Sequence, residues 1–221
     1  MNRGVEMDNS KKVLIKVCGL TDVTEAAYLN KNKINFAGFV LFFPKSKRNI
    51  SIEQAEKIMT ELDDNIKKVA VVVSPNKEQI SQINDSIFDY IQIHGETSDD
   101  VLEMAKLPIL KAFNIDDMNE LERYKKNDKI KGFVFDAAKP GSGKAFDWNI
   151  LKKIECEEKL LILAGGLNVR NVKEAVEFVN PDVVDVSSGV EYDNEVGKDP
   201  EKIEEFANQV RIKSVKLEEE R

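Results

Sequence analysis

Short apolar runs alternate with amphipathic helical patterns along almost the whole chain, and this alternation limits the possible folds more than any other feature. The runs are rich in Val, Ile and Phe and are nearly continuous, as in strands that are covered on both faces. Between them, apolar residues recur at spacings of three and four, which predicts helices with one buried face. The predicted strands span residues 13–17, 35–41, 67–73, 88–93, 108–113, 130–135, 159–163 and 182–186.

The clearest predicted helices follow these strands in order and span residues 24–31, 52–62, 77–84, 99–106, 169–179 and 200–213. Eight strand–helix units in 221 residues favour a single-domain α/β fold over residues 1–221, the closed (β/α)8 or TIM barrel. An open doubly wound sheet is the competing fold, but the Gly-x-Gly-x-x-Gly fingerprint of a dinucleotide site does not follow the first predicted strand. We expect residues 1–11 to form an N-terminal extension and residues 213–221 a solvated charged tail.

Composition argues against several classes of function. The net charge of −7 does not suit a protein that binds nucleic acid or an anionic membrane. No apolar stretch approaches the roughly 20 residues that span a bilayer. The first residues lack the apolar core of a signal peptide, so we expect a cytoplasmic location.

Cysteine and histidine are scarce. The two cysteines, Cys18 and Cys156, lie far apart in the sequence, so we expect reduced thiols rather than a disulfide framework. The one histidine, His94, has no cluster of cysteines around it, which argues against a structural zinc site.

The ends of the predicted strands carry the candidate chemistry, because the parallel strands of a barrel all end at one mouth. Cys18 follows the first predicted strand and Asp136 follows the sixth. A shared mouth would bring this thiol and this carboxyl to one substrate as an acid–base pair. Taken alone, a cysteine such as Cys18 is more commonly an inert core thiol than a catalytic group.

The loop after the second predicted strand, residues 44–51, is basic in an acidic protein. Arg48 in this loop could form a fork on a substrate carboxylate, and the alternative is a solvated surface arginine. Ser51 is expected to cap the next helix, because Gln54 follows three residues later as in a capping box.

Other polar residues at strand ends have structural alternatives of equal or greater weight. His94 ends the fourth predicted strand and is either a substrate contact or a helix-capping group, while Gln92 is expected to point into the barrel. Thr21 or Asp22 is expected to cap the first helix, and Asp147 a later one.

Glycines and serines suggest a phosphate site. They follow the last two predicted strands, as Gly165, Gly166, Ser187, Ser188 and Gly189. In many barrels, backbone amides at these two loops hold a phosphate, although ordinary turns have the same composition. The Gly-Ser-Gly turn at residues 141–143, with Gly143, could meet an anion in the same way, but flexible loops often carry such a turn.

Together these segments resemble the phosphoribosylanthranilate isomerase family, barrel enzymes of tryptophan biosynthesis. The similarity runs from about residue 13 to about residue 211, and the order of its motifs is specific. The matching stretches are residues 16–21, 38–40, 44–48, 92–96, 136, 141–148, 163–167 and 185–191.

The resemblance implies an Amadori rearrangement of N-(5-phosphoribosyl)anthranilate to 1-(2-carboxyphenylamino)-1-deoxyribulose 5-phosphate, without a metal or redox cofactor. It makes Cys18 the general base, Asp136 the general acid and Arg48 the contact of the anthranilate carboxylate. We expect burial to raise the pKa of Asp136 and a nearby cation such as Lys16 to lower that of Cys18. The substrate-binding residues are then Lys16, Arg48, Gln92, His94, Gly143, Gly165, Gly166, Ser187, Ser188 and Gly189.

The chain departs from the family pattern at Pro140, in a longer segment at residues 192–197, and in residues 1–11. Two alternatives stay open: a non-catalytic barrel that binds a phosphometabolite, and an isomerase of a related phosphorylated aminoaldose. A pentose-phosphate epimerase would need paired histidines, and indole-glycerol-phosphate synthase a longer N-terminal helix and a lysine-rich mouth. The expected partner is a small phosphorylated substrate, with no nucleic acid or membrane, bound by a monomer or a homodimer.

Overall fold

The computed structural model describes residues 12–114, 118, 120–136, 147–194 and 196–212. Pro140, Gly143, the predicted extension at residues 1–11 and the predicted tail at residues 213–221 lie outside these ranges. The strands are β1 (Leu14–Cys18), β2 (Phe36–Leu41), β3 (Asn49–Ile50), β4 (Lys67–Val73), β5 (Tyr90–His94), β6 (Ile109–Asn114), β7 (Ile130–Asp136), β8 (Leu160–Leu163) and β9 (Val183–Val186).

The strands form one parallel sheet that closes on itself. Their order is β1-β9-β8-β7-β6-β5-β4-β2-β3, and the additional pairing of β1 with β2 completes the ring. Within the described residues, the ring contains eight strands, and the two-residue β3 adds only a short pairing to β2. The predicted barrel is therefore confirmed, and the open doubly wound sheet is wrong.

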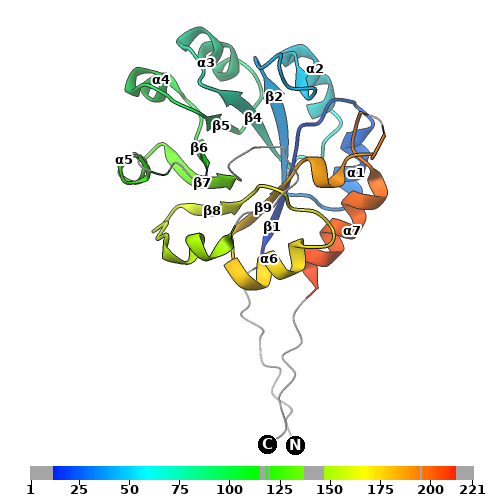
Figure 1. The fold of residues 1–221 in the computed structure, drawn as a ribbon. Helices are drawn as coiled ribbons and strands as arrows, with labels where there is room; N and C mark the ends of the chain where they lie inside the picture. The colour runs from blue at the N-terminus through cyan, green and yellow to red at the C-terminus, as the bar shows by residue number, and fades with distance from the viewer. Residues whose placement is uncertain (1–11, 115–117, 119, 137–146, 195, 213–221) are drawn as a thin grey trace, which may run out of the picture.

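Helices surround the strands, as Figure 1 shows. Each predicted strand lies within two residues of its expected bounds, whereas β3 and α5 were not among the predicted elements. The helices are α1 (Glu25–Lys31), α2 (Ile52–Met59), α3 (Lys77–Asn84), α4 (Asp99–Met104), α5 (Leu121–Lys125), α6 (Val172–Val179) and α7 (Pro200–Arg211), with 3-10 helices η1 (Trp148–Lys153) and η2 (Ser188–Val190). No helix in the described ranges has the length and apolar character needed to cross a membrane.

Alternate residues of each strand face two different apolar layers, which explains why the strands are apolar without a break. In β7, Phe133 and Phe135 pack into the outer layer beneath the helices, while Val134 packs inside the barrel. In β1, Ile15 and Val17 belong to the outer layer and Cys18 to the interior cluster. The same two-residue period therefore directs the last residue of β1 toward the inside of the mouth.

Most of the predicted caps are confirmed. The Ser51 side chain accepts a hydrogen bond from the Gln54 backbone and Gln54 returns one, which completes the capping box of α2. Asp147 caps η1. The prediction for α1 is wrong: its N-cap residue is Thr24, whose side chain makes no capping bond, and Asp22 instead accepts hydrogen bonds from Thr24 in the preceding turn.

Candidate active site

A cavity of about 210 Å³ opens at the carboxyl ends of the strands. Most of the predicted site residues line it, namely Cys18, Asp136, Arg48, Gln92, His94, Gly165, Gly166, Ser187 and Ser188. Lys16 and Gly189 are not among its lining residues, and Gly143 lies outside the described residues. A larger cavity of about 980 Å³ adjoins it and shares Phe43, Val73 and His94 with it.

The thiol and the carboxyl of the predicted acid–base pair both line this cavity. Cys18 ends β1 and Asp136 ends β7, so β9 and β8 lie between them around the ring. This spacing separates the two groups along the wall while leaving both within one space. The barrel therefore brings together two residues that are more than a hundred positions apart in the sequence.

Burial dominates the protonation of Cys18, which is 9% exposed. Burial raises the pKa of this thiol, and the charges of Lys16 and Lys198 only partly oppose that rise. Lys16 thus lowers the pKa of Cys18, as expected, but the cost of charging a buried thiol exceeds the attraction of the cations, so the net shift is upward. The Cys18 backbone is held in place by Ser187, whose hydroxyl donates to the Cys18 carbonyl at 2.9 Å.

Lys16 is buried inside the barrel and is not among the residues that line the cavity. Its ammonium group forms an ion pair with Asp185 at 2.7 Å, and both side chains are buried. The two residues are direct partners in the register of β1 and β9. Burial alone would lower the pKa of Lys16, but the attraction and hydrogen bond of Asp185, with a contribution from Cys18, outweigh it and raise the pKa.

His94 is a neutral group in this site. Burial, together with the charges of Lys16 and Lys111, lowers its pKa to about 3. The Gln92 amide nitrogen lies 2.8 Å from His94 Nε2, an arrangement in which the amide donates and the unprotonated imidazole accepts. Gln92 is 2% exposed, so it is the inward-pointing polar side chain that the sequence predicted.

The two predicted phosphate turns pack against each other. Gly165 and Gly166 have φ values of +80° and +72°, in the left-handed region that favours glycine. Gly189 lies so close to the Leu167 carbonyl that an added Cβ would be 2.0 Å from that oxygen. The loops after β8 and β9 are thus in direct contact at the mouth.

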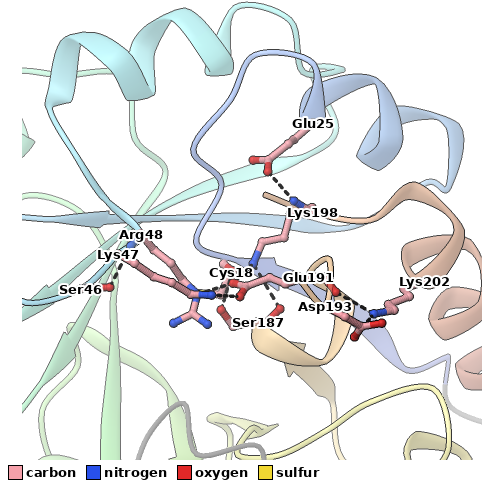
Figure 2. Close-up of polar contacts among 10 residues, drawn as sticks. All are labelled: Cys18, Glu25, Ser46, Lys47, Arg48, Ser187, Glu191, Asp193, Lys198 and Lys202. Carbon is pink, nitrogen blue, oxygen red and sulfur yellow. Dashed lines mark hydrogen bonds and ion pairs between the residues drawn. The ribbon is translucent and has the colours of Figure 1, made fainter. Parts of the chain in front are cut away.

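An ionic cluster around the buried carboxylate of Glu191 was not predicted from the sequence. Glu191 forms ion pairs with Arg48, Lys47 and Lys198, at 2.5 Å, 2.7 Å and 3.1 Å. Figure 2 shows this carboxylate between cations that come from opposite ends of the chain. Glu191 belongs to one of the motifs singled out above, but its role depends on a loop 143 residues away, and no spacing signal predicts such a contact.

Within the described ranges, no three side chains of His, Cys, Asp or Glu are grouped so as to hold a metal ion.

The longer segment at residues 192–197 is drawn together at its ends. Glu191 and Lys198 form an antiparallel bridge, and the Tyr192 amide donates to the Gly197 carbonyl at 3.2 Å.

Comparison with known proteins gives a consistent result. The family model for N-(5'-phosphoribosyl)anthranilate isomerase matches residues 15–209. A curated protein of that name from Clostridium acetobutylicum is 40% identical over 208 residues, covering 90% of this chain and 98% of its own length. One from Thermoanaerobacter sp. is 41% identical over 205 residues, with the same coverage.

Solved structures of this family have the same fold. The Thermotoga maritima enzyme is 33% identical, with a TM-score of 0.79 over 90% of this chain and 98% of its own. A second structure, 31% identical with a TM-score of 0.76 and the same coverage, holds reduced 1-(o-carboxyphenylamino)-1-deoxyribulose 5-phosphate. This chain therefore belongs to the N-(5'-phosphoribosyl)anthranilate isomerase family.

Proposed function

We propose that this chain catalyses the isomerisation of N-(5'-phosphoribosyl)anthranilate in tryptophan biosynthesis, with Cys18 as general base and Asp136 as general acid. It is an enzyme of the isomerase class, as its family membership implies. The observation that carries the assignment of roles is a thiol and a carboxyl on the wall of one cavity, next to two glycine-containing turns. A non-catalytic binding protein would have no use for this pair.

The first step is ring opening. Protonated Asp136 donates its proton to the ribose ring oxygen, the bond from that oxygen to carbon 1 breaks, and the amine nitrogen supplies the electrons to form an iminium. The Cys18 thiolate then removes the proton from carbon 2, which leaves an enolamine. Tautomerisation of the enolamine to the ketone completes an internal redox shift that needs no external oxidant or reductant.

The thiolate is the minor form of Cys18 at neutral pH, because burial raises the pKa of the thiol. The Lys16 and Lys198 charges favour the thiolate over what burial alone would permit. General acid–base catalysis of this kind contributes about 10²–10⁴ in rate. Lys16 is proposed to act through its charge on Cys18, which is supported by the lowering of the Cys18 pKa by Lys16.

Substrate binding is proposed to involve the loop after β2 and the turns after β8 and β9. Arg48 is proposed to bind the anthranilate carboxylate, and the turns after β8 and β9 the phosphate. Gln92 and neutral His94 form a polar part of the wall between β4 and β6. The cytoplasmic location and the assembly as a monomer or a homodimer stay predictions.

Substitution of the acid–base pair tests this assignment. Cys18→Ala and Asp136→Asn are each expected to lower kcat by about 10²–10⁴, because each removes one proton transfer. The measurement is the loss of substrate fluorescence on turnover, with circular dichroism to show that the variants are folded. Cys156→Ala is the matched control, because Cys156 packs against the outer layer and should leave kcat unchanged. A near-normal rate in either test variant removes that residue from the mechanism.

A further inference from the structure

The carboxylate of Glu191 is enclosed by cations at the edge of the cavity. Its side chain is 7% exposed, and that of its partner Lys198 is fully buried. Burial alone would raise the pKa of Glu191, but the hydrogen bonds and charges of Arg48, Lys198 and Lys47 lower it to about 2. Glu191 is therefore an ionised carboxylate at neutral pH.

Arg48 is held from two sides. Its side-chain methylenes lie on the backbone of Gly19, where an added Cβ would be 2.4 Å from Arg48 Cδ. Its Nε donates to Glu191 Oε1 at 2.5 Å. In the described part of the chain, the two terminal nitrogens of Arg48 have no hydrogen-bond partner, and Figure 2 shows them beyond the Nε contact. Because Arg48 lines the cavity, these nitrogens are its available donors there.

The backbone of Glu191 is itself held in place by hydrogen bonds. Its amide donates to the Ser188 carbonyl, and its own carbonyl accepts a hydrogen bond from Lys202 at 2.9 Å. The backbone amide of Lys198 donates to buried Glu25, which also accepts hydrogen bonds from the β1–α1 loop. The carboxylate is thus a rigid acceptor, whereas an unrestrained arginine side chain has many rotamers.

We propose that Glu191 is a positioning residue for substrate binding: it holds Arg48 by Nε so that the two terminal nitrogens can form a fork on the substrate carboxylate. This inference rests on the proposed function, in which Arg48 meets the anthranilate carboxylate. A guanidinium has five donors in a fixed plane, so fixing Nε also fixes the direction of the other four. Glu191 touches no reacting atom in this scheme.

A rival role for Glu191 is simple charge balance, in which it offsets the three neighbouring cations. The two roles predict opposite signs for one substitution. Glu191→Ala frees Arg48, so positioning predicts that KM rises about tenfold while kcat changes by less than about twofold. Charge balance predicts that KM falls, because the rim becomes more positive toward an anionic substrate. A lowered or unchanged KM overturns the proposal.

A second variant separates the effect of side-chain length from the effect of charge. It also keeps the proposal testable if Glu191→Ala does not fold. Glu191→Asp keeps a negative charge near buried Lys198 but shortens the side chain by one methylene. Positioning predicts a raised KM for this variant also, and a wild-type KM overturns the proposal. Asp193→Asn is the matched control: Asp193 lies in the same loop and pairs with Lys202, but it is 84% exposed and does not contact Arg48. Its KM should equal that of the wild type.

Arg48→Met distinguishes a failure of this inference from a failure of the proposed function. In the Arg48→Met background, Glu191→Asp should not raise KM further, because the residue that it positions is gone. A further rise of the same size shows that Glu191 acts independently of Arg48 and overturns the inference alone. If Arg48→Met by itself leaves KM unchanged, the proposed carboxylate role of Arg48 fails, and the role of Glu191 fails with it.

Discussion

Single side chains at the mouth of this barrel have protonation properties that the same side chains would not have in water. Burial raises the pKa of Cys18 and lowers that of His94 to about 3, while three cations hold the pKa of Glu191 at about 2. The result is a mouth with a neutral imidazole, a permanent carboxylate and a thiol that resists ionisation. Each state depends on burial and on neighbouring charges that the folded barrel brings together, several of them from distant parts of the sequence.

We predict that His94 titrates far below the ordinary histidine pKa of about 6.5, with a folded-state value of about 3. Because His94 is the one histidine in the chain, the NMR signals of its imidazole give this value directly. In the unfolded chain, His94 binds a proton near pH 6.5. In the folded chain, it binds that proton only near pH 3. Its contribution to the free energy of unfolding is therefore full above pH 6.5 and is lost progressively as the pH falls toward 3.

His94→Gln is the control for this titration. The variant lacks the imidazole, so the decrease in stability just below pH 6.5 should be smaller than in the wild type. Urea-unfolded protein should give an imidazole midpoint near the ordinary value. A midpoint near 6.5 in the folded wild-type protein would contradict the prediction.

The N-cap of a helix can fix the end of a loop that contains a proposed binding residue. The loop from β2 to α2 contains Arg48 and ends at Ser51, the capping residue of α2. The capping box satisfies backbone donors at the first turn and so defines where the loop ends. The N-cap of α4 is also a serine with extended backbone, Ser98, but its side chain makes no capping bond.

Ser51→Ala is therefore expected to lower the free energy of unfolding by about 1 kcal/mol, since it removes a side-chain acceptor for the α2 backbone. Urea denaturation followed by circular dichroism measures this loss. Ser98→Ala is the matched control, because it makes the same change at an N-cap position without a bond to lose, and it should cost clearly less. Equal losses in the two variants would show that the capping bond contributes nothing.

Because the barrel is closed, side chains from its strands pack together in one interior. Ile162 on β8 is 1% exposed inside the ring, where it packs in a cluster with Cys18 and residues from strands all round the barrel. The helices meet a separate outer layer that includes Trp148, the one tryptophan. A cavity made in the interior therefore removes contacts shared by several strands.

Ile162→Ala is expected to lower the free energy of unfolding by about 2–5 kcal/mol, the usual cost of truncating a buried isoleucine. Circular dichroism and Trp148 fluorescence should show the same shift in denaturation midpoint, because interior and outer layer unfold together. Ile87→Ala makes the same change at a position that is 54% exposed, and its cost should stay below about 0.5 kcal/mol. Separate midpoints for the two probes would contradict cooperative unfolding of the barrel.

The sequence alone was sufficient to predict the barrel and most of the residues that line the cavity of the candidate site. Strand and helix periods are local properties, so the eight strands of the ring and most of the helices, though not α5, were predicted from residues that lie next to one another. Parallel strands that close into a ring must end at one mouth, which is why Cys18 and Asp136 could be paired in advance. The Ser51 cap was predictable for the same reason, since its partner Gln54 lies three residues away.

Only the tertiary structure decided the electrostatics. The net shift in the pKa of Cys18 is upward although Lys16 lowers it, because the depth of burial is set by packing among all strands. Lys16 pairs with Asp185, which lies 169 residues away in the sequence, and Arg48 pairs with Glu191, which lies 143 residues away. Coulomb and desolvation energies depend on distance in space, and the linear order of residues does not contain that distance until the barrel has closed.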